Sequence, residues 1–404
     1  MSTDIILPAF PEIASSLHAS DYMISLTMPL NMGMRGLSMV VIGLLSDRFG
    51  QKKMMVVSLV LFVGGSIICM SSSNIQTMLL GSVVQAMGEG SDALVQAVLR
   101  VLIDEEKERM NVISVLTSLQ PVFVIMAPLM GSALSSYLGW RSIYWFLILC
   151  AGSSLTVYAL LVPETRNNSP KQPVLKQFAA VLCNQEALVL LVPFALMFTV
   201  LSSMLCNIPF ILDGFGVPPL GKGFLIASMG PFVTIGAVVT NNVFQSNDQN
   251  LFVTCSRAMG FQCVLLVSMF CMAMAFVHVQ WLVMASSWSI PLGMGMCLPV
   301  LATLYLEPLK DACGLASGIL IGAQNVLSAL LMPISSGALE AHGTQSMFVV
   351  LMVFHLVCQA VFWMGFAINH GKWVPKDEHD NGNVDFQRVV SANTLFSRST
   401  SGLL

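Results

Sequence analysis

The sequence predicts an all-α membrane protein with 12 transmembrane helices in two six-helix bundles, and three observations support this fold class. Charged residues make up 10% of the 404 residues, against roughly 25% in soluble domains, and apolar residues make up 55%. The apolar residues gather into runs long enough to cross a bilayer. One long polar stretch divides these runs into two sets of six. Backbone polar groups cannot stay unpaired in lipid, so the runs must be helices.

Eleven long apolar segments emerge with a window of about 19 residues. They lie at 23–45, 54–71, 77–99, 111–136, 142–163, 186–212, 222–244, 258–277, 280–304, 313–338 and 344–368. The opening stretch, MSTDIILPAFPEIASSL, adds the twelfth. A helix from Met1 to about Ala19 is roughly 28 Å long, barely a span, so we expect a truncated first helix with Asp4 at the cytoplasmic rim. Either the true start lies upstream or half a helix has been lost.

The domain boundaries follow from the longest internal polar stretch, ETRNNSPKQPVLKQ from Glu164. It predicts an inter-bundle loop over 164–185, between an N-terminal bundle (1–163) and a C-terminal bundle (186–368). Residues 369–404 are polar and lack helical periodicity, which predicts a disordered tail.

The basic residues predict the orientation, because cytoplasmic loops collect them. Of the 18 Lys and Arg residues, 15 fall on one side of the predicted spans together with the tail, and only Arg141 and Lys222 fall on the other. We therefore expect a multi-pass protein of the plasma membrane, in a bacterium the inner membrane, with both termini and the 164–185 loop in the cytoplasm.

Several function classes are excluded by what the sequence lacks. The net charge of −3 gives no footprint for nucleic acid. The ten cysteines and six histidines are scattered without metal-binding spacing, so we expect neither a metal nor another cofactor. No Gly-rich phosphate loop or nucleophile elbow is present, so an enzyme is not expected.

A loop motif, GLLSDRFGQKK, stands between the second and third predicted spans. Glycines permit tight turns, an aspartate can cap a helix end, and basic residues hold the loop at an anionic membrane face. The residues in these roles are Gly43, Asp47, Arg48, Gly50 and Lys52. The ordered string resembles the signature loop of the major facilitator superfamily.

Further motifs extend the resemblance over most of residues 1–368. STDIILPAFPEIA is similar to the first-helix motif of the Bcr/CflA drug-resistance subfamily. MAPLMGSAL, which contains Pro128 and Gly131, resembles its fifth-helix antiporter motif, and GLASGILIGAQN resembles its eleventh helix. The resemblance implies the major-facilitator fold and alternating access, with protons entering as amphiphilic compounds or drugs are exported. The implied partners are a small-molecule substrate, protons and the lipid bilayer, with a monomeric protein.

Asp4 occupies the position of the family's usual proton carrier. A carboxylate in a low-dielectric helix has a raised proton affinity, so it can load and release protons as its surroundings change. The alternative is that Asp4 is only the N-cap of a helix beginning at Ile5.

A polar stripe marks the fourth predicted span, where the family's usual arginine is missing. Its residues are spaced so that all fall within an arc of about 80° on one helix, and they are Ser82, Gln85, Glu89, Asp92, Gln96 and Arg100. Such a stripe must face a cavity or another helix. Glu89 and Asp92 are therefore further candidates for proton coupling.

Arg35 lies inside the second predicted span. By residue count it stands at the same depth as Glu89, roughly 17 to 18 Å from the cytoplasmic surface. We predict that Arg35 is the charge partner of Glu89 or Asp92. The alternative is that Arg35 only snorkels or meets backbone carbonyls.

The remaining candidates are structural or line a cavity. Pro128 and Gly131 provide a kink and a close helix contact, as a hinge needs. The polar residues Gln85, Gln120, Asn207 and Gln324 are candidates for the substrate cavity, although each could equally form an interhelical hydrogen bond. Three functions stay open: a proton-coupled exporter of drugs or amphiphiles, a dedicated metabolite or sugar exporter, and a transport-deficient membrane protein with a truncated first helix.

Overall fold

The computed structural model describes residues 2–91, 94–95, 99, 105–162, 181, 184–244 and 251–373. The described residues form helices joined by short turns. The predicted inter-bundle loop falls mostly outside this part of the chain, as does the tail from residue 374 onward.

The helices of the first half group into six segments within the described residues. They are α1 (Ser2–Ile6) with η1 (Leu7–Ala9) and α2 (Phe10–Ser16), α3 (Asp21–Ser25) with α4 (Thr27–Phe49), α5 (Gln51–Met70), α6 (Ile75–Glu89), α8 (Glu106–Leu138) and α9 (Arg141–Leu161).

The second half contributes six more segments. They are α11 (Gln185–Gly214), α12 (Pro219–Ala227) with α13 (Gly230–Val239) and η2 (Thr240–Phe244), α14 (Leu251–Ala275), α15 (Gln280–Leu306) with η3 (Glu307–Ala312), α16 (Cys313–His342) and α17 (Thr344–Trp373).

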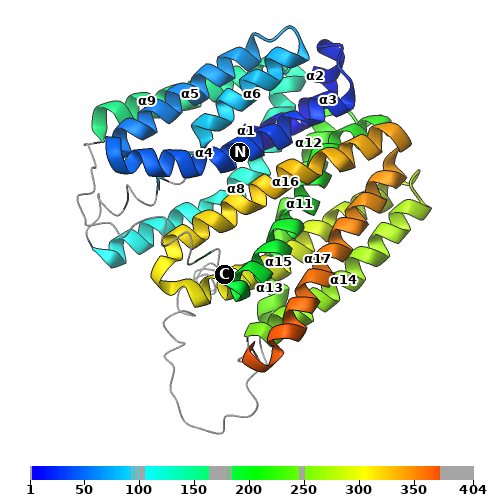
Figure 1. Cartoon of the computed structure of the whole chain (residues 1–404). Coiled ribbons are helices and arrows are strands. Elements are labelled where there is room, and N and C mark those ends of the chain that lie inside the picture. The colour runs from blue at the N-terminus through cyan, green and yellow to red at the C-terminus, as the bar shows by residue number, and fades with distance from the viewer. Residues whose placement is uncertain are drawn as a thin grey trace, which may run out of the picture.

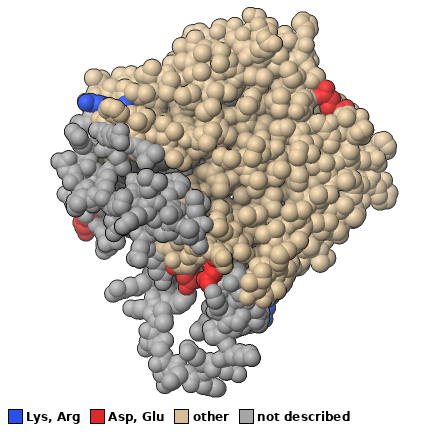
Figure 2. Space-filling model, viewed as in Figure 1, with Lys and Arg blue, Asp and Glu red and all other residues tan. Residues whose placement is uncertain are grey.

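Eight helices in the described part of the chain are long and apolar enough to cross a membrane. They span 51–70, 141–160, 185–214, 219–243, 251–275, 280–309, 315–342 and 344–368. Large apolar side chains are exposed along their sides, such as Leu160, Val264 and Ile368. Lys, Arg, Asp and Glu are sparse on the described part of the face in Figure 2, and its broad tan area carries none of them. This surface fits hydrocarbon, and the chain is a multi-pass membrane protein.

Breaks in the helices have local causes. The 3₁₀ turn η1 contains Pro8, which cannot donate a helical hydrogen bond, and Pro231 at the start of α13 interrupts the segment begun by α12 in the same way. Helix α17 continues to Trp373, so residues 369–373 at the start of the expected tail are helical, and residues from 374 onward lie outside the described part of the chain.

The fourth segment differs most from expectation, because the predicted continuous helix over 77–99 is wrong. Helix α6 ends at Glu89 and a turn follows at Gly90 and Ser91. A Cβ on Gly90 would overlap the Ser38 hydroxyl, so α4 approaches the chain closely at this point. Of the polar stripe, Ser82, Gln85 and Glu89 lie on α6, and its later members lie outside the described residues.

The two halves of the chain lie side by side in Figure 1, blue to cyan and then green to red. Contacts between them join α4 to α16, α8 to α12, and α2 to α11. A buried apolar cluster also crosses the boundary, since Phe10 of α2 lies 6.0 Å from Phe210 of α11 between ring centroids. We call the contact of α3 and α4 with α16 the α4–α16 seam.

The helices turn at two opposite ends of the molecule. Gly139, Gly216 and Gly343 stand at turns of one end with φ of 78°, 71° and 81°, and Gly50 stands at the other with φ of 99°. This left-handed backbone favours glycine. We call these the Gly139 end and the Gly50 end.

Candidate functional site

A small cavity lies between the two halves of the chain, with Asp4 in its wall. Its volume is about 60 Å³. The other lining residues are apolar or glycine and come from both halves, namely Leu7, Pro128, Leu201, Leu205, Ile226, Ala227, Met229, Gly230, Val233 and Pro291. Asp4 is the sole ionisable residue among these lining residues. The cavity therefore combines one carboxylate with an apolar surface at the bundle interface.

The depth of Asp4 corrects two expectations. Asp4 lies against Pro128, Leu201 and Pro291, each within the middle part of a long helix, so it is at mid-depth and not at the cytoplasmic rim. The chain is already helical at Ser2, so Asp4 sits inside α1 and does not cap a helix beginning at Ile5. Both errors came from counting along the first segment alone, whereas the packing of α1 against α8 sets its depth.

Arg35 of α4 connects the two halves at this level. Its Nη1 lies 3.6 Å from Oε2 of Glu89 on α6, and its Nη2 donates to Oδ1 of Asn325 on α16 at 3.0 Å. The Arg35 and Glu89 side chains are 17% and 10% exposed, and Asn325 is fully buried. The guanidinium thus contacts a carboxylate of its own half and an amide of the other.

Asp4 belongs to the same electrostatic neighbourhood, because the charge of Arg35 acts on it. The side chains of Asp4, Glu89 and Arg35 carry two acidic groups and one basic group. Charge at mid-depth in the membrane is costly, so these ionisable groups must be kept out of lipid.

The rest of the predicted polar stripe is used differently. Gln85 donates from Nε2 to the Ser66 hydroxyl of α5 at 2.9 Å, and Ser82 donates to the Met78 carbonyl at 3.0 Å. Gln85 therefore ties α6 to α5 within one half and does not line the cavity. Asp92, with Gln96 and Arg100, lies outside the described residues.

The other candidates for the cavity wall also lie elsewhere. Asn207 of α11 is buried and donates from Nδ2 to the Ser203 carbonyl at 2.8 Å and to the Ser335 hydroxyl of α16 at 3.2 Å. It is an interhelical contact within the second half. Gln324 is half-buried on α16 and does not line the cavity, and the side chain of Gln120 lies outside the described part.

The loop motif forms the turn between α4 and α5. Gly50 has φ of 99°, which explains the need for glycine there. Gly43 lies on α4, and Lys52 is half-buried at the start of α5. The side chains of Asp47 and Arg48 are outside the described residues.

Gly131 makes the close helix contact that its motif predicted. A Cβ there would overlap the carbonyl oxygen of Ile5, so the backbones of α8 and α1 touch. Pro128, one turn earlier, lines the cavity and its carbonyl faces Gly223 of α12. Helix α8 thus packs against the Asp4 helix on one side and the second half on the other.

Replacing Gly131 with alanine is expected to destabilise the folded protein by about 1–3 kcal/mol, because α1 must move away from α8. Thermal unfolding in detergent measures this loss. The control is Gly152→Ala in α9, where an added Cβ meets no atom within 4 Å and alanine favours the helix. Equal melting temperatures for the two variants would contradict the tight contact.

The sequence also contains a second carboxylate in its first segment, Glu12, whose role was not foreseen. Glu12 accepts a hydrogen bond from the Ser135 hydroxyl, and its Oε1 accepts from the Trp140 amide at 3.2 Å. It therefore ties α2 to the end of α8 and the start of α9. In the sequence, Glu12 follows Pro11 and lies eight residues after Asp4. Neither feature distinguishes this structural role from proton coupling.

Polar contacts close the α4–α16 seam at the Gly139 end. Glu340 of α16 accepts from the Tyr22 amide at 2.9 Å and from the Ser20 hydroxyl at 3.4 Å. Partial burial, then the charge of Glu340 and that of Asp213, raise the pKa of Asp21. Asp213 itself pairs with Lys222. Acidic groups of both halves thus meet at this end.

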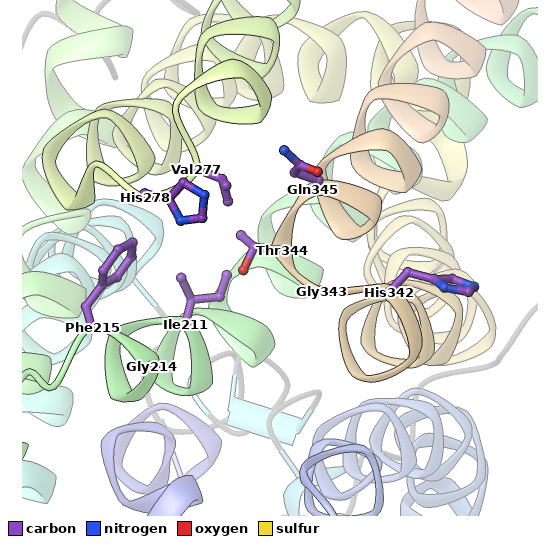
Figure 3. A pocket seen from close by; sticks show the side chains of 9 residues that line it. All are labelled: Ile211, Gly214, Phe215, Val277, His278, His342, Gly343, Thr344 and Gln345. Carbon is purple, nitrogen blue, oxygen red and sulfur yellow. The ribbon is translucent and has the colours of Figure 1, made fainter.

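A second, larger cavity of about 360 Å³ opens at the Gly139 end of the second half. Figure 3 shows Phe215, His278 and Thr344 around the opening, whereas His342 points away. The two histidines do not converge. Within the described part of the chain, no group of three or more His, Cys, Asp or Glu side chains could hold a metal ion, and the eight cysteines whose side chains are described are free thiols.

Comparison with known proteins gives a consistent family. The model of the Major Facilitator Superfamily matches residues 1–307. Multidrug resistance protein D of Escherichia coli is 24% identical over 342 residues, covering 83% of this chain and 85% of that protein. Citrate exporter 1 of Aspergillus niger is 27% identical over 165 residues, 41% of this chain, and the alignment spans only 32% of the exporter.

Solved structures agree with this assignment at the level of the fold. A bacterial homologue of the human lysosomal transporter Spinster, in an inward-facing and unoccupied conformation, superposes with a TM-score of 0.70 at 15% identity, covering 93% of this chain and 95% of that one. The human organic anion transporter MFSD10 gives a TM-score of 0.58 at 15% identity, with coverages of 88% and 89%. With the family model matching most of its length, this chain belongs to the Major Facilitator Superfamily of secondary transporters, and not to an enzyme family.

Proposed function

We propose that this protein exports small amphiphilic compounds or drugs in exchange for protons, by alternating access. The observation that carries the proposal is the position of Asp4, a carboxylate in an otherwise apolar cavity that both halves of the chain line. A carboxylate there binds a proton readily when its surroundings are dry and releases it when they are wet.

The packing between the halves supports alternating access. At the Gly139 end the halves are joined by Glu340 and by the Phe10–Phe210 contact. Toward the Gly50 end the packing of α4 against α16 loosens among the described residues. A Cβ on Gly36 of α4 would come within 3.2 Å of Asn325, whereas one on Gly43, seven residues further on the same face, meets no described atom within 4 Å. This packing fits a state open toward the Gly50 end, like the inward-facing Spinster homologue.

The setting of Asp4 supports coupling of a cation to a proton. A monovalent organic cation in the cavity favours the ionised carboxylate, and a proton on Asp4 favours a cavity without the cation. Exchange of a lipophilic cation for a proton therefore keeps the charge in the cavity low at each stage.

A dedicated organic-acid exporter is the second candidate, because the citrate exporter is among the relatives. A tricarboxylate needs basic partners, and no Lys, Arg or His is among the residues that line the Asp4 cavity. The cavity thus favours the first proposal. A transport-deficient membrane protein is the third possibility and makes the opposite prediction in the same assay.

The test is transport by the purified full-length protein in liposomes with an acidic lumen. Ethidium, a lipophilic monovalent cation, is expected to accumulate inside as protons leave, and a proton ionophore is expected to abolish the accumulation. Labelled citrate is tested in parallel. Accumulation of citrate and not ethidium would support the organic-acid exporter, and accumulation of neither in a folded preparation would support the transport-deficient protein.

The proposed orientation has both termini in the cytoplasm, as the distribution of basic residues requires. Cysteines introduced at positions 170 and 385 are expected to resist a membrane-impermeant maleimide in intact cells and to react after permeabilisation. A cysteine at Tyr137, which is exposed near the Gly139 end, is the control and should react in intact cells. Labelling of either cytoplasmic position from outside would contradict the two-bundle topology.

A further inference from the structure

The hydrogen bond between Arg35 and Asn325 joins residues 290 positions apart in the chain and one half of the molecule to the other. Both side chains also keep a polar group that is not hydrogen-bonded within the described part of the chain. The Asn325 Nδ2 and the Arg35 Nε are both buried without a hydrogen-bond partner among the described residues. Leaving such groups unpaired is costly, and a contact that served packing alone would gain from an apolar pair.

Helices α4 and α16 pack closely beside the side chains of Arg35 and Asn325. A Cβ on Gly33 would come within 2.9 Å of Ala329, and one on Gly36 within 3.2 Å of Asn325. One heptad further toward the Gly50 end, Gly43 and Gly318 face no described atom within 4 Å. Asn325 therefore stands where the close packing of the seam ends.

Arg35 is shared between competing acceptors. Its distance to Glu89, 3.6 Å, exceeds the 2.7–2.9 Å of a good charge-assisted bond, whereas its bond to Asn325 is 3.0 Å. Among the described residues Arg35 contacts the ionisable Glu89 on α6 and the neutral Asn325 on α16, and its charge also acts on Asp4 of α1. Opening the seam breaks the bond to Asn325 and leaves the guanidinium with the carboxylates of its own half.

We propose that Asn325 is a positioning residue of the transport cycle, which holds the Gly139 end closed through Arg35 and yields Arg35 to Glu89 and Asp4 when the seam opens. The inference rests on the proposed function, because it assigns a step of alternating access. A guanidinium released to the carboxylates favours their ionised forms. By linkage, opening of the seam and loss of the proton then promote each other.

The test measures the distance between nitroxide labels at Ser16 and Ala341, two exposed residues on opposite halves at the Gly139 end. Reactive native cysteines, including the exposed Cys150 and Cys271, are first replaced with serine. Double electron–electron resonance is recorded from pH 5 to pH 9, with and without ethidium. Native protein is expected to show a short and a long distance, corresponding to a closed and an open Gly139 end.

Asn325→Ala is expected to raise the ratio of open to closed molecules by about ten- to a hundredfold, the effect of losing one hydrogen bond to a charged group. It should also move the midpoint of the pH dependence to lower pH. Asn325→Asp places a carboxylate opposite Arg35 and is expected to lower the ratio by at least as much. The matched control is Asn207→Ala, another buried asparagine whose bonds stay within the second half, and its ratio should equal that of the native protein.

A double variant separates positioning from simple structural support. Glu89→Gln removes the carboxylate that Arg35 contacts within its own half, and adding Asn325→Asp restores a carboxylate, but now across the seam. The double variant is expected to regain the melting temperature lost in Glu89→Gln and to show only the short distance.

Two outcomes would overturn the inference. If native protein shows both distances and neither Asn325→Ala nor Asn325→Asp changes their ratio or its pH dependence, Asn325 does not position Arg35. If native protein shows a single distance at every pH, with and without ethidium, alternating access fails, and the proposed function fails together with the inference.

Discussion

Asp4→Asn is expected to reduce proton-driven ethidium accumulation by about tenfold or more, to the level seen without a gradient. Protonated aspartate and asparagine have nearly the same shape and neither is charged. The variant should therefore fold, and the side chain of residue 4 should still line the cavity between the halves. Only the cycle of proton binding and release is lost. Liposomes with an acidic lumen provide the measurement.

Binding provides a second readout for Asp4. Ethidium binding to native protein in detergent should release protons, because a cation in the cavity favours the ionised carboxylate, and that release should vanish in Asp4→Asn. The control is Asp21→Asn, an exposed carboxylate at the Gly139 end, which should transport like native protein. Undiminished gradient-driven accumulation by Asp4→Asn would transfer the coupling role to Glu89 or Asp92.

Removing Arg35 has the second large expected effect. Arg35→Gln removes the positive charge that lies 3.6 Å from the Glu89 carboxylate, which is only 10% exposed. Breaking such a pair costs about 3–5 kcal/mol, so the variant is expected to express poorly or melt early and to lose transport. The control is Lys53→Gln, which removes an exposed positive charge from the same half and should change little.

The reversed pair tests whether Arg35 and Glu89 act together. Arg35→Glu combined with Glu89→Arg should recover part of the stability that each single change removes, and a double-mutant cycle measures the coupling. The proposed network would be wrong if Glu89→Gln and Asp92→Asn, singly and together, left both folding and transport unchanged.

Much of this protein could be predicted from local patterns in the sequence. Apolar runs require helices in lipid whatever surrounds them, so the membrane fold and the number of helical segments follow from composition and length. Glycines at Gly50 and Gly131 are required by a turn and a backbone contact that recur in the family motifs. Arg35 and Glu89 could be matched by depth, because helical rise is regular.

The tertiary structure decided what such counting cannot reach. The sequence by itself determined that Asp4, Arg35 and Glu89 must be kept out of lipid, since uncompensated charge there is costly. Which partner each polar group finds depends on the rotation and crossing of helices far apart in the chain. Helix packing determined that Gln85 hydrogen-bonds to Ser66, Asn207 to Ser335, and Glu340 to the start of α3. Likewise, only the close approach of α1 to α8 placed Asp4 at mid-depth, because a helix fixes the spacing of its own residues but not its position against its neighbours.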